Sequence, residues 1–345
     1  MKKIVLITLL CLVLPGVSFA GPKWDIGEDS WLTLSFLGQA HYSFMDDAAD
    51  EEEFYLRRGR IILAGQIMDG VKIFMETDND NHGKNGVNAN TDIQDAFVDV
   101  RLGKADYCWV KAGLIMLPFS FENASSAASL LGLDYNSEVL KFTNSFVWRN
   151  YGVEIHGSFA DKFAYRAGVF DGYDNANEEA DLRFTGHVAF NLIGNVNSGW
   201  FHSQNRLSQG NYLSIGAGYD TQDKATINST TFVERDSEAW VLDAQSGFDL
   251  GEDIGLTING AYYDWDSSIY NGNTMFVETG FLFIKKFQVT AKYSNQKPDD
   301  SSLSDTTDYT YGLHYFHKKH NLRGGIEYRT GDSSDWILLG IQFLI

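Results

Sequence analysis

Cysteine, proline and long hydrophobic segments are scarce in this chain of 345 residues, and each scarcity excludes a class of structure. The only cysteines are Cys11 and Cys108, too few for a disulfide framework or a thiolate metal cluster. After residue 20, no apolar run approaches the roughly 18 to 20 residues that a membrane helix needs. The 4 Pro and 33 Gly favour strands and turns over helices.

Basic residues are also in deficit. The chain has 27 Lys and Arg against 46 Asp and Glu, which gives a formal net charge of −19. A surface of this sign repels the phosphate backbone, so the composition argues against nucleic acid as a partner.

The first twenty residues have the pattern of a cleaved signal peptide. Lys2 and Lys3 form a basic start, residues 4–14 an apolar core, and residues 18–20 (SFA) a small-x-small cleavage site. We therefore expect residues 1–20 to be removed on export and residues 21–345 to form one domain. Cys11 would be lost with the signal peptide.

Alternating apolar and polar residues recur along the mature chain in segments of about nine to twelve residues, the length of a tilted membrane strand. In residues 92–102, for example, Ala96, Val98 and Val100 alternate with Asp95 and Asp99. The pattern predicts an all-β, antiparallel transmembrane barrel of about sixteen strands. These lie at 31–44, 53–66, 71–79, 92–102, 108–117, 148–158, 163–171, 182–193, 211–220, 238–250, 254–264, 273–284, 286–295, 308–318, 320–329 and 335–345. A secreted soluble β-sandwich is the alternative.

The connections alternate between short and long, as they do when short turns lie on the periplasmic side and long loops outside. The longest outer loop spans residues 118–147. Residues 194–210 are too long for their periplasmic side, so either they extend neighbouring strands or the strand register slips there. Tryptophans, among them Trp109, Trp200 and Trp265, fall near predicted strand ends, where we expect aromatic girdles.

Five segments resemble the phosphate-selective porins of the porin O and porin P type, in that family's order and over about half of the mature chain. They are residues 54–64 (FYLRRGRIILA), 92–101 (DIQDAFVDVR), 110–122 (VKAGLIMLPFSFE), 149–157 (RNYGVEIHG) and 165–190. The resemblance implies a sixteen-stranded channel, usually trimeric, with an inward-folded third loop and cationic residues that bind phosphate. The third loop here departs from that pattern, since Lys141 is its only basic residue, against Glu122, Asp134 and Glu138.

Charged strand residues are the candidates for the pore lining. Arg58 and Arg60 share one face of their strand, with Arg57 expected on the other. The basic residues could form an electropositive strip, or they could pair with Glu76, Asp95, Asp99 and Glu154 as wall salt bridges. The predicted pore-lining residues are Arg58, Arg60, Asp95, Asp99, Arg101, Lys111, Lys141 and Arg149.

We expect no cofactor, no metal and no catalysis. The Gly-x-Ser-x-Gly and His-Glu-x-x-His motifs are absent. Residues 78–83 (DNDNHG) resemble the start of a calcium loop, but Ala89 stands where its bidentate Glu belongs. His314, His317 and His320 would alternate between strand faces, which disfavours a shared metal.

The predicted protein is a porin of the Gram-negative outer membrane that passes small hydrophilic solutes or ions, weakly selective or preferring cations, with anions such as phosphate possible. Its expected partners are outer-membrane lipid and lipopolysaccharide, and a homotrimer is possible. The alternative is a barrel that acts as a sleeve or scaffold for a partner protein. The last strand places Ile337, Ile341 and Phe343 toward lipid. We expect Phe343, rather than the terminal Ile345, to serve as the aromatic assembly signal.

Overall fold

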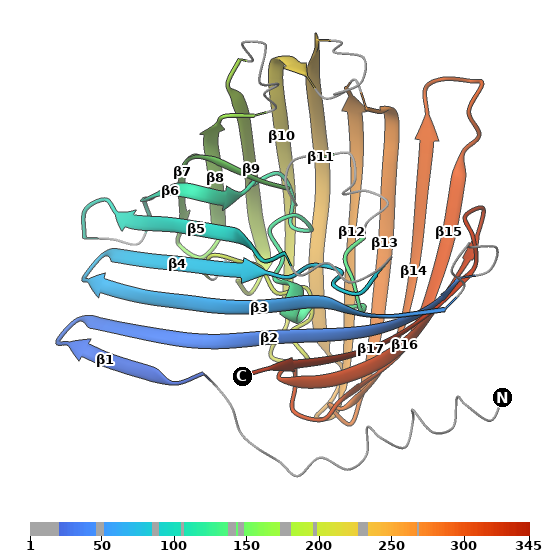
Figure 1. Cartoon of the computed structure of the whole chain (residues 1–345), viewed down its shortest axis with the longest axis horizontal. Helices are drawn as coiled ribbons and strands as arrows, with labels where there is room; N and C mark the ends of the chain where they lie inside the picture. The colour runs from blue at the N-terminus through green and yellow to red at the C-terminus, as the bar shows by residue number, and fades with distance from the viewer. Residues whose placement is uncertain are drawn as a thin grey trace.

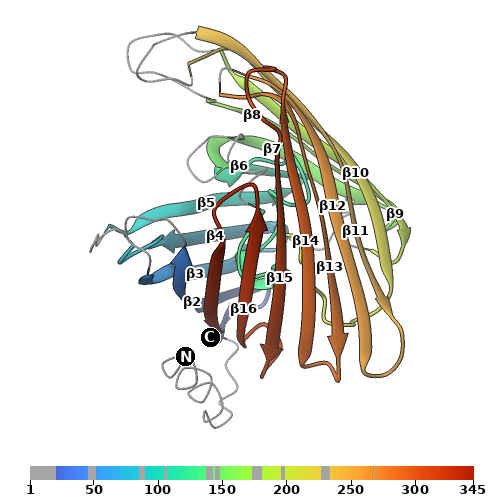
Figure 2. The same cartoon turned by 90° about the vertical axis from the view of Figure 1, so that its right-hand side faces the viewer.

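The computed structural model is a closed barrel of antiparallel strands (Figures 1 and 2). It describes residues 21–45, 52–84, 90–104, 107–136, 143, 148–172, 181–195, 199–226, 234–267 and 269–345. The barrel strands are β2 Ser30–Met45, β3 Glu52–Met68, β4 Val71–Asp78, β5 Asp92–Arg101, β6 Trp109–Met116, β7 Arg149–Phe159, β8 Phe163–Phe170, β9 Arg183–Ile193, β10 Tyr212–Thr226, β11 Glu234–Asp249, β12 Ile254–Asp266, β13 Asn271–Phe283, β14 Phe287–Pro298, β15 Thr306–Phe316, β16 Leu322–Gly331 and β17 Trp336–Leu344. Each pairs with the next along the chain, and β17 pairs with β2 to close the ring.

The sixteen predicted strands are confirmed, with ends that differ by a few residues. One further strand, β1 Lys23–Gly27, was not predicted. It is fully exposed, and although Trp24 and Ile26 alternate with Lys23 and Asp25, its five residues are too few for the roughly nine to eleven of a membrane strand. It pairs with the start of β2, beside the end of β17, and extends the seam of the barrel. The signal peptide predicted at 1–20 lies outside the described residues.

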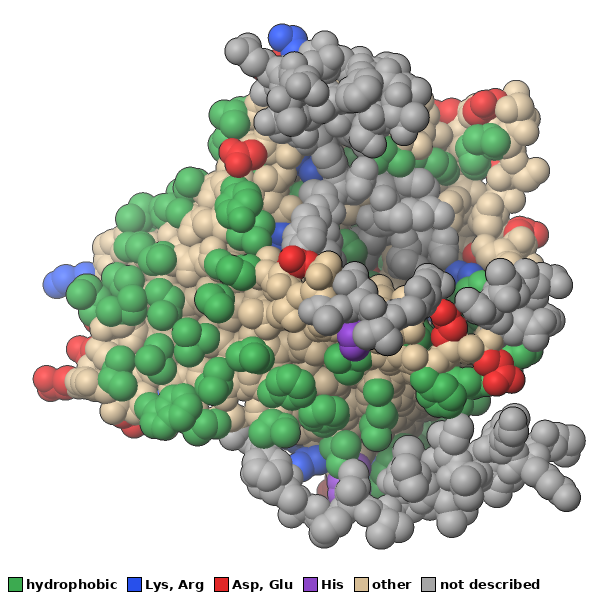
Figure 3. Space-filling view, in the orientation of Figure 1, with side chains coloured by type: hydrophobic (Ala, Val, Ile, Leu, Met, Phe, Trp, Pro, Cys, Tyr) green, Lys and Arg blue, Asp and Glu red, His purple; other side chains and the backbone are tan. Residues whose placement is uncertain are grey.

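Most polar side chains of the strands point into the barrel, and most of the exposed large apolar side chains point out. On β5, Asp95 and Asp99 are buried inside, whereas Val98 is 43% exposed outside. Hydrophobic side chains gather over the outer face of β2 to β5 (Figure 3). A soluble sandwich would bury these side chains, so the inverted arrangement excludes that alternative and fits strands surrounded by lipid. No helix among the described residues is long and apolar enough to cross a membrane.

The closing seam is covered by an aromatic ring. Phe343 of β17 lies opposite Gly38 of β2, and its ring stacks on Phe36 with centroids 5.6 Å apart. A side chain at position 38 would collide with that ring. Ile345 contributes through its backbone, since its N–H and C=O both bond to Phe36 at 2.9 Å.

We predict that Phe343→Ala lowers the yield of folded barrel more than Ile345→Ala. Removal of the ring exposes Gly38 and loses a cross-strand contact of about 0.2–1 kcal/mol, whereas Ile345→Ala retains both backbone bonds. The folded fraction can be measured as the heat-modifiable band on a gel without boiling. Wild-type yields for both variants would contradict the role assigned to Phe343.

Candidate functional site in the barrel lumen

The chain turns inward after β6 and crosses the lumen. We call residues 117–136 the inner loop; they contain a short 3₁₀ helix, Ala127–Ser129, whose N-terminus is capped by Ser126. On one wall, Gln39 Nε2 of β2 donates to Ala127 O at 3.0 Å. On the other, Phe121 N donates to Asp243 Oδ2 of β11 at 2.7 Å. Because β2 and β11 lie about half a turn apart in the ring, the described part of loop 118–147 folds into the pore.

Asp134 ties the inner loop to β3. Arg58 Nη2 lies 2.8 Å from Asp134 Oδ1, and Arg57 also bonds to this carboxylate. Burial alone would raise the pKa of Asp134, but the charges of Arg57 and Arg58 hold it well below its usual value. The prediction that Arg57 faces away from Arg58 is wrong. Gln39 pairs with Arg58 and Ala40 with Leu56, so a β-bulge at Arg57 lets neighbouring arginines reach the same loop residue.

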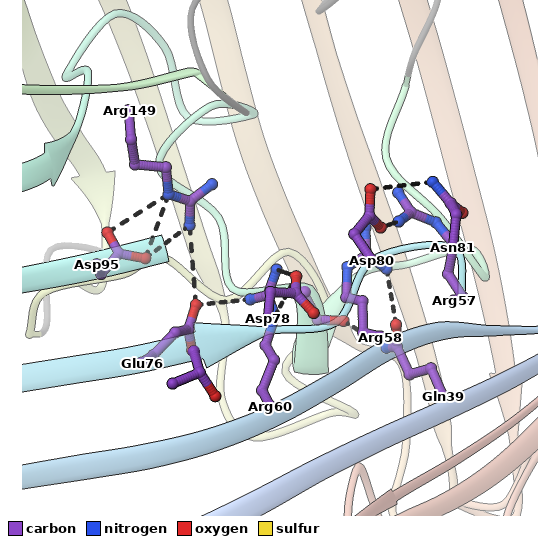
Figure 4. A network of polar contacts seen from close by, with 12 residues as sticks. Gln39, Arg57, Arg58, Arg60, Glu76, Asp78, Asp80, Asn81, Asp95 and Arg149 are labelled. Carbon is purple, nitrogen blue, oxygen red and sulfur yellow. Dashed lines mark hydrogen bonds and ion pairs between the residues drawn. The ribbon is translucent and has the colours of Figure 1, made fainter. Parts of the chain in front are cut away.

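Next to this contact, a chain of ion pairs follows the wall formed by β3, β4, β5 and β7 (Figure 4). Arg60 donates to Glu76 at 2.7 Å and to Asp78 at 2.9 Å. Arg149 donates to Asp95 at 3.0 Å and lies 3.9 Å from Glu76. All five side chains are buried. Each arginine lies between carboxylates, so positive and negative charges alternate along the wall and do not form patches of one sign.

The remaining predicted lining residues are also paired where they are described. Lys111 Nζ lies 2.9 Å from Glu154 Oε1. Asp99 accepts from Trp200 Nε1 at 2.8 Å and contacts His156 at 2.9 Å. Arg101 bonds to Asp69 at the strand end, away from the inner loop. Lys141 lies outside the described residues.

Two lumen residues that sequence reasoning missed hold the other side of the inner loop. Arg323 of β16 donates to Leu130 O at 2.7 Å and to Gly132 O at 3.0 Å. Glu327, on the same face of β16, accepts from Leu133 N at 2.8 Å. The two-residue period could have placed both side chains inside, but nothing in the sequence indicates that they contact the loop.

The connection between β9 and β10 also enters the lumen, so residues 194–210 do not extend the neighbouring strands as one of the two expectations had it. The strand register shifts by one residue at that end, because Leu213 pairs with Ile193 and Ser214 with Asn191, which leaves a β-bulge at Leu192. The extra length instead forms what we call the inner segment, residues 199–207. Its side chains His202, Gln204 and Asn205 are fully buried.

Possible metal ligands in this region have other partners. Asp78 binds Arg60, and Asp80, beyond β4, binds Arg57. His314 contacts Thr290 at 3.1 Å, whereas His320 contacts Asn205 O at 2.7 Å. Within the described ranges, no group of three or more His, Cys, Asp or Glu side chains is arranged to hold a metal ion.

The sequence profile of the phosphate-selective porin O and P family matches residues 37–245, more than half of the chain. The chain belongs to this family. This phosphate-selective porin O and P family member is therefore a channel of the Gram-negative outer membrane through which solutes diffuse passively, as the resemblance predicted. Among curated proteins, no sequence relative matches the chain.

Solved porin structures share the fold of this family member. OmpF of Salmonella typhi, in complex with daunomycin, is 12% identical, with a TM-score of 0.68 over 94% of this chain and 100% of that one. OmpT of Vibrio cholerae, in a trimer form, is 12% identical, with a TM-score of 0.62 over 92% and 100%. An anion-selective porin from Comamonas acidovorans is 14% identical, with a TM-score of 0.59 over 92% and 100%. At these identities the likeness establishes the fold alone.

Proposed function

We propose that the channel passes small hydrophilic solutes and ions with weak selectivity that favours cations. The observation that carries this proposal is the pairing of the expected basic strip. Arg58, Arg60, Lys111 and Arg149 each lie within 3.0 Å of a carboxylate oxygen. A phosphate would have to compete with these carboxylates for the same donors.

The balance of charged side chains in the lumen also supports a preference for cations. Among the described side chains that are fully buried, eleven are Asp or Glu and six are Arg or Lys. Glu122 of the inner loop belongs to the acidic excess, as do Asp243 and Glu278 on the wall. Rings of carboxylates attract cations, and the interspersed arginines weaken that preference.

The reversal potential in a salt gradient tests this proposal. Purified barrel in a planar bilayer with potassium chloride at unequal concentrations should give a potential of the cation-selective sign, with a permeability ratio of only about two to five. Inorganic phosphate added to one side should leave the chloride current unchanged. A strong anion preference, or block of the current by phosphate, would contradict the proposal.

The assembly proposed for the membrane is a homotrimer in contact with lipid and lipopolysaccharide. The trimer form of the Vibrio cholerae porin supports the oligomer, and the apolar outer face supports the lipid contact. The alternative of a sleeve around a partner protein has no such support. The inner loop and inner segment occupy space in the lumen that a threaded partner would need.

A further inference from the structure

We propose that the inner segment, residues 199–207, is a second constriction element that works with the inner loop and sets the size limit of the channel. The inference rests on the proposed passage of solutes through the lumen. The inner segment enters the lumen from the rim opposite to that of the inner loop. The inner loop follows β6, the fifth strand of the barrel, and the inner segment follows β9, the eighth, so the two strands end at opposite rims.

One side of the inner segment is anchored to β4, β5 and β8. The Trp200 ring packs against Phe74 and Phe97 of the wall, with centroids 5.2 and 5.4 Å away. Its indole N–H donates to Asp99 at 2.8 Å. Arg166 of β8 donates to Trp200 O at 3.2 Å and to Gly199 O at 3.0 Å, so both ring and backbone are fixed.

The middle of the inner segment is joined to the inner loop by backbone hydrogen bonds. His202 N donates to Ala124 O at 2.8 Å, and His202 O accepts from Ser126 N at 2.9 Å. These bonds form a parallel bridge between Ser125 and His202. Further along, Asn205 N donates to Ser129 O at 3.1 Å. Two connections from opposite rims are therefore hydrogen-bonded to each other inside the barrel.

The end of the inner segment reaches the far wall. Asn205 Nδ2 donates to Gln288 Oε1 of β14 at 2.9 Å, and Asn259 Nδ2 of β12 donates to Gln204 O at 3.3 Å. Leu207 packs with Leu282 and Phe316. Because β5 and β14 lie about half a turn apart in the ring, the inner segment spans the lumen as the inner loop does.

A sixteen-stranded barrel is wide enough to leave an aqueous channel unless segments of the chain fill it. Two segments that each join opposite walls reduce the open cross-section more than one, and solutes must pass between them. The buried side chains His202, Gln204 and Asn205 are polar, so the added constriction is lined by hydrogen-bonding groups. The size limit should then depend on the inner segment as much as on the inner loop.

The direct test replaces residues 195–211 by Asn-Gly, which joins Gly194 to Tyr212, next to the paired Ile193 and Leu213, in a tight two-residue turn. Conductance in planar bilayers should rise at least about two-fold, and liposomes should swell in larger sugars than wild type admits. The matched control deletes residues 300–304 from the exposed connection after β14, which should change neither value. Trp200→Ala should raise conductance partially, whereas the outward-facing Trp240→Ala should not.

A folded, heat-modifiable variant with wild-type conductance and wild-type size limit would overturn the inference. Failure of the proposed function can be distinguished from this. A wild type that passes no solute, beside a shortened variant that does, would refute free diffusion and support the constriction; two non-conducting barrels would refute both.

A cysteine pair keeps the inference testable if the shortened variant does not fold. Ser125→Cys and His202→Cys, in a Cys108→Ser background, should form a disulfide because these residues are bridge partners inside the barrel. Mass spectrometry of the folded protein under oxidising conditions would detect it. The absence of that cross-link in folded barrel would overturn the inference.

Discussion

Replacing Asp134 with alanine should detach the inner loop from β3 and convert the channel into a wider one that admits anions more readily. Asp134 accepts from both Arg57 and Arg58, and Arg58 is fully buried. Removing one partner of a buried ionic contact leaves the other charge uncompensated, which costs on the order of 3 kcal/mol. This cost destabilises the docked position of the inner loop, because the carboxylate of Asp134 neutralises two guanidinium groups there.

Release of the loop and exposure of the arginines should be measurable together in a planar bilayer. Single-channel conductance should increase about two-fold or more, and the reversal potential should move toward the anion-selective sign, since Arg57 and Arg58 would face the water-filled lumen. Asp300→Ala removes the same charge from an exposed connection and is the matched control. Unchanged conductance and reversal potential in a folded Asp134→Ala barrel would show that this contact does not hold the loop.

The barrel itself could be predicted because lipid and lumen impose opposite chemistry on alternate residues. On β5, Asp95, Phe97 and Asp99 are buried on the inner face, whereas the alternate residues Ala96, Val98 and Val100 are apolar and more exposed, an alternation visible without any knowledge of partners. Strand β1 escaped prediction because its alternation, Trp24 and Ile26 against Lys23 and Asp25, covers only five residues, about half of a membrane-spanning strand.

The contacts inside the lumen could not be read from the sequence, because they join residues far apart in the chain. Arg58 and Asp134 are separated by 76 positions, and Arg323 and Leu130 by 193. Periodicity reports which face a side chain occupies and contains no information about which loop fills the space in front of it. The bulge at Arg57 breaks even that rule, since one extra residue reverses the expected face.

Tryptophan shows the same limitation. Position near a strand end predicted interfacial girdles, yet Trp109 and Trp265 are buried, and Trp200 bonds to Asp99 in the lumen. An indole suits either site, because both offer an apolar surface beside a polar partner. The excess length of residues 194–210 was the only sequence signal of the inner segment. It indicated that this connection is unusual for the periplasmic side, but not that the connection enters the lumen.

The second large effect concerns pH and the carboxyl group of Glu122, at the junction of the inner loop and the inner segment. Burial, reinforced by the charge of Glu278 on β13, raises the pKa of Glu122 from 4.5 to about 8. Lys292 of β14 and donation from Asn136 oppose that rise without cancelling it. Gln204 of the inner segment donates to the same carboxyl group.

The sign of the pH dependence follows from the raised pKa. The docked loop binds the proton more tightly than a released loop, whose Glu122 would titrate near the ordinary 4.5. The contribution of the protonated group to docking is therefore fully present below 4.5 and is lost as the pH rises to about 8. Above that value, two negative charges share a buried site, and the junction between the two inner elements weakens.

Conductance of the wild type should therefore increase several-fold, with more frequent transitions between conductance levels, as the pH rises from 4.5 to about 8. Glu122→Gln keeps the shape of the side chain and removes the charge, so its conductance should stay low and constant over the same range. Glu252→Gln, at an exposed turn, is the matched control and should respond to pH as wild type does. If Glu122→Gln retained the wild-type response, the pH dependence would have to come from another group, and the carboxyl pair would not govern docking of the inner loop.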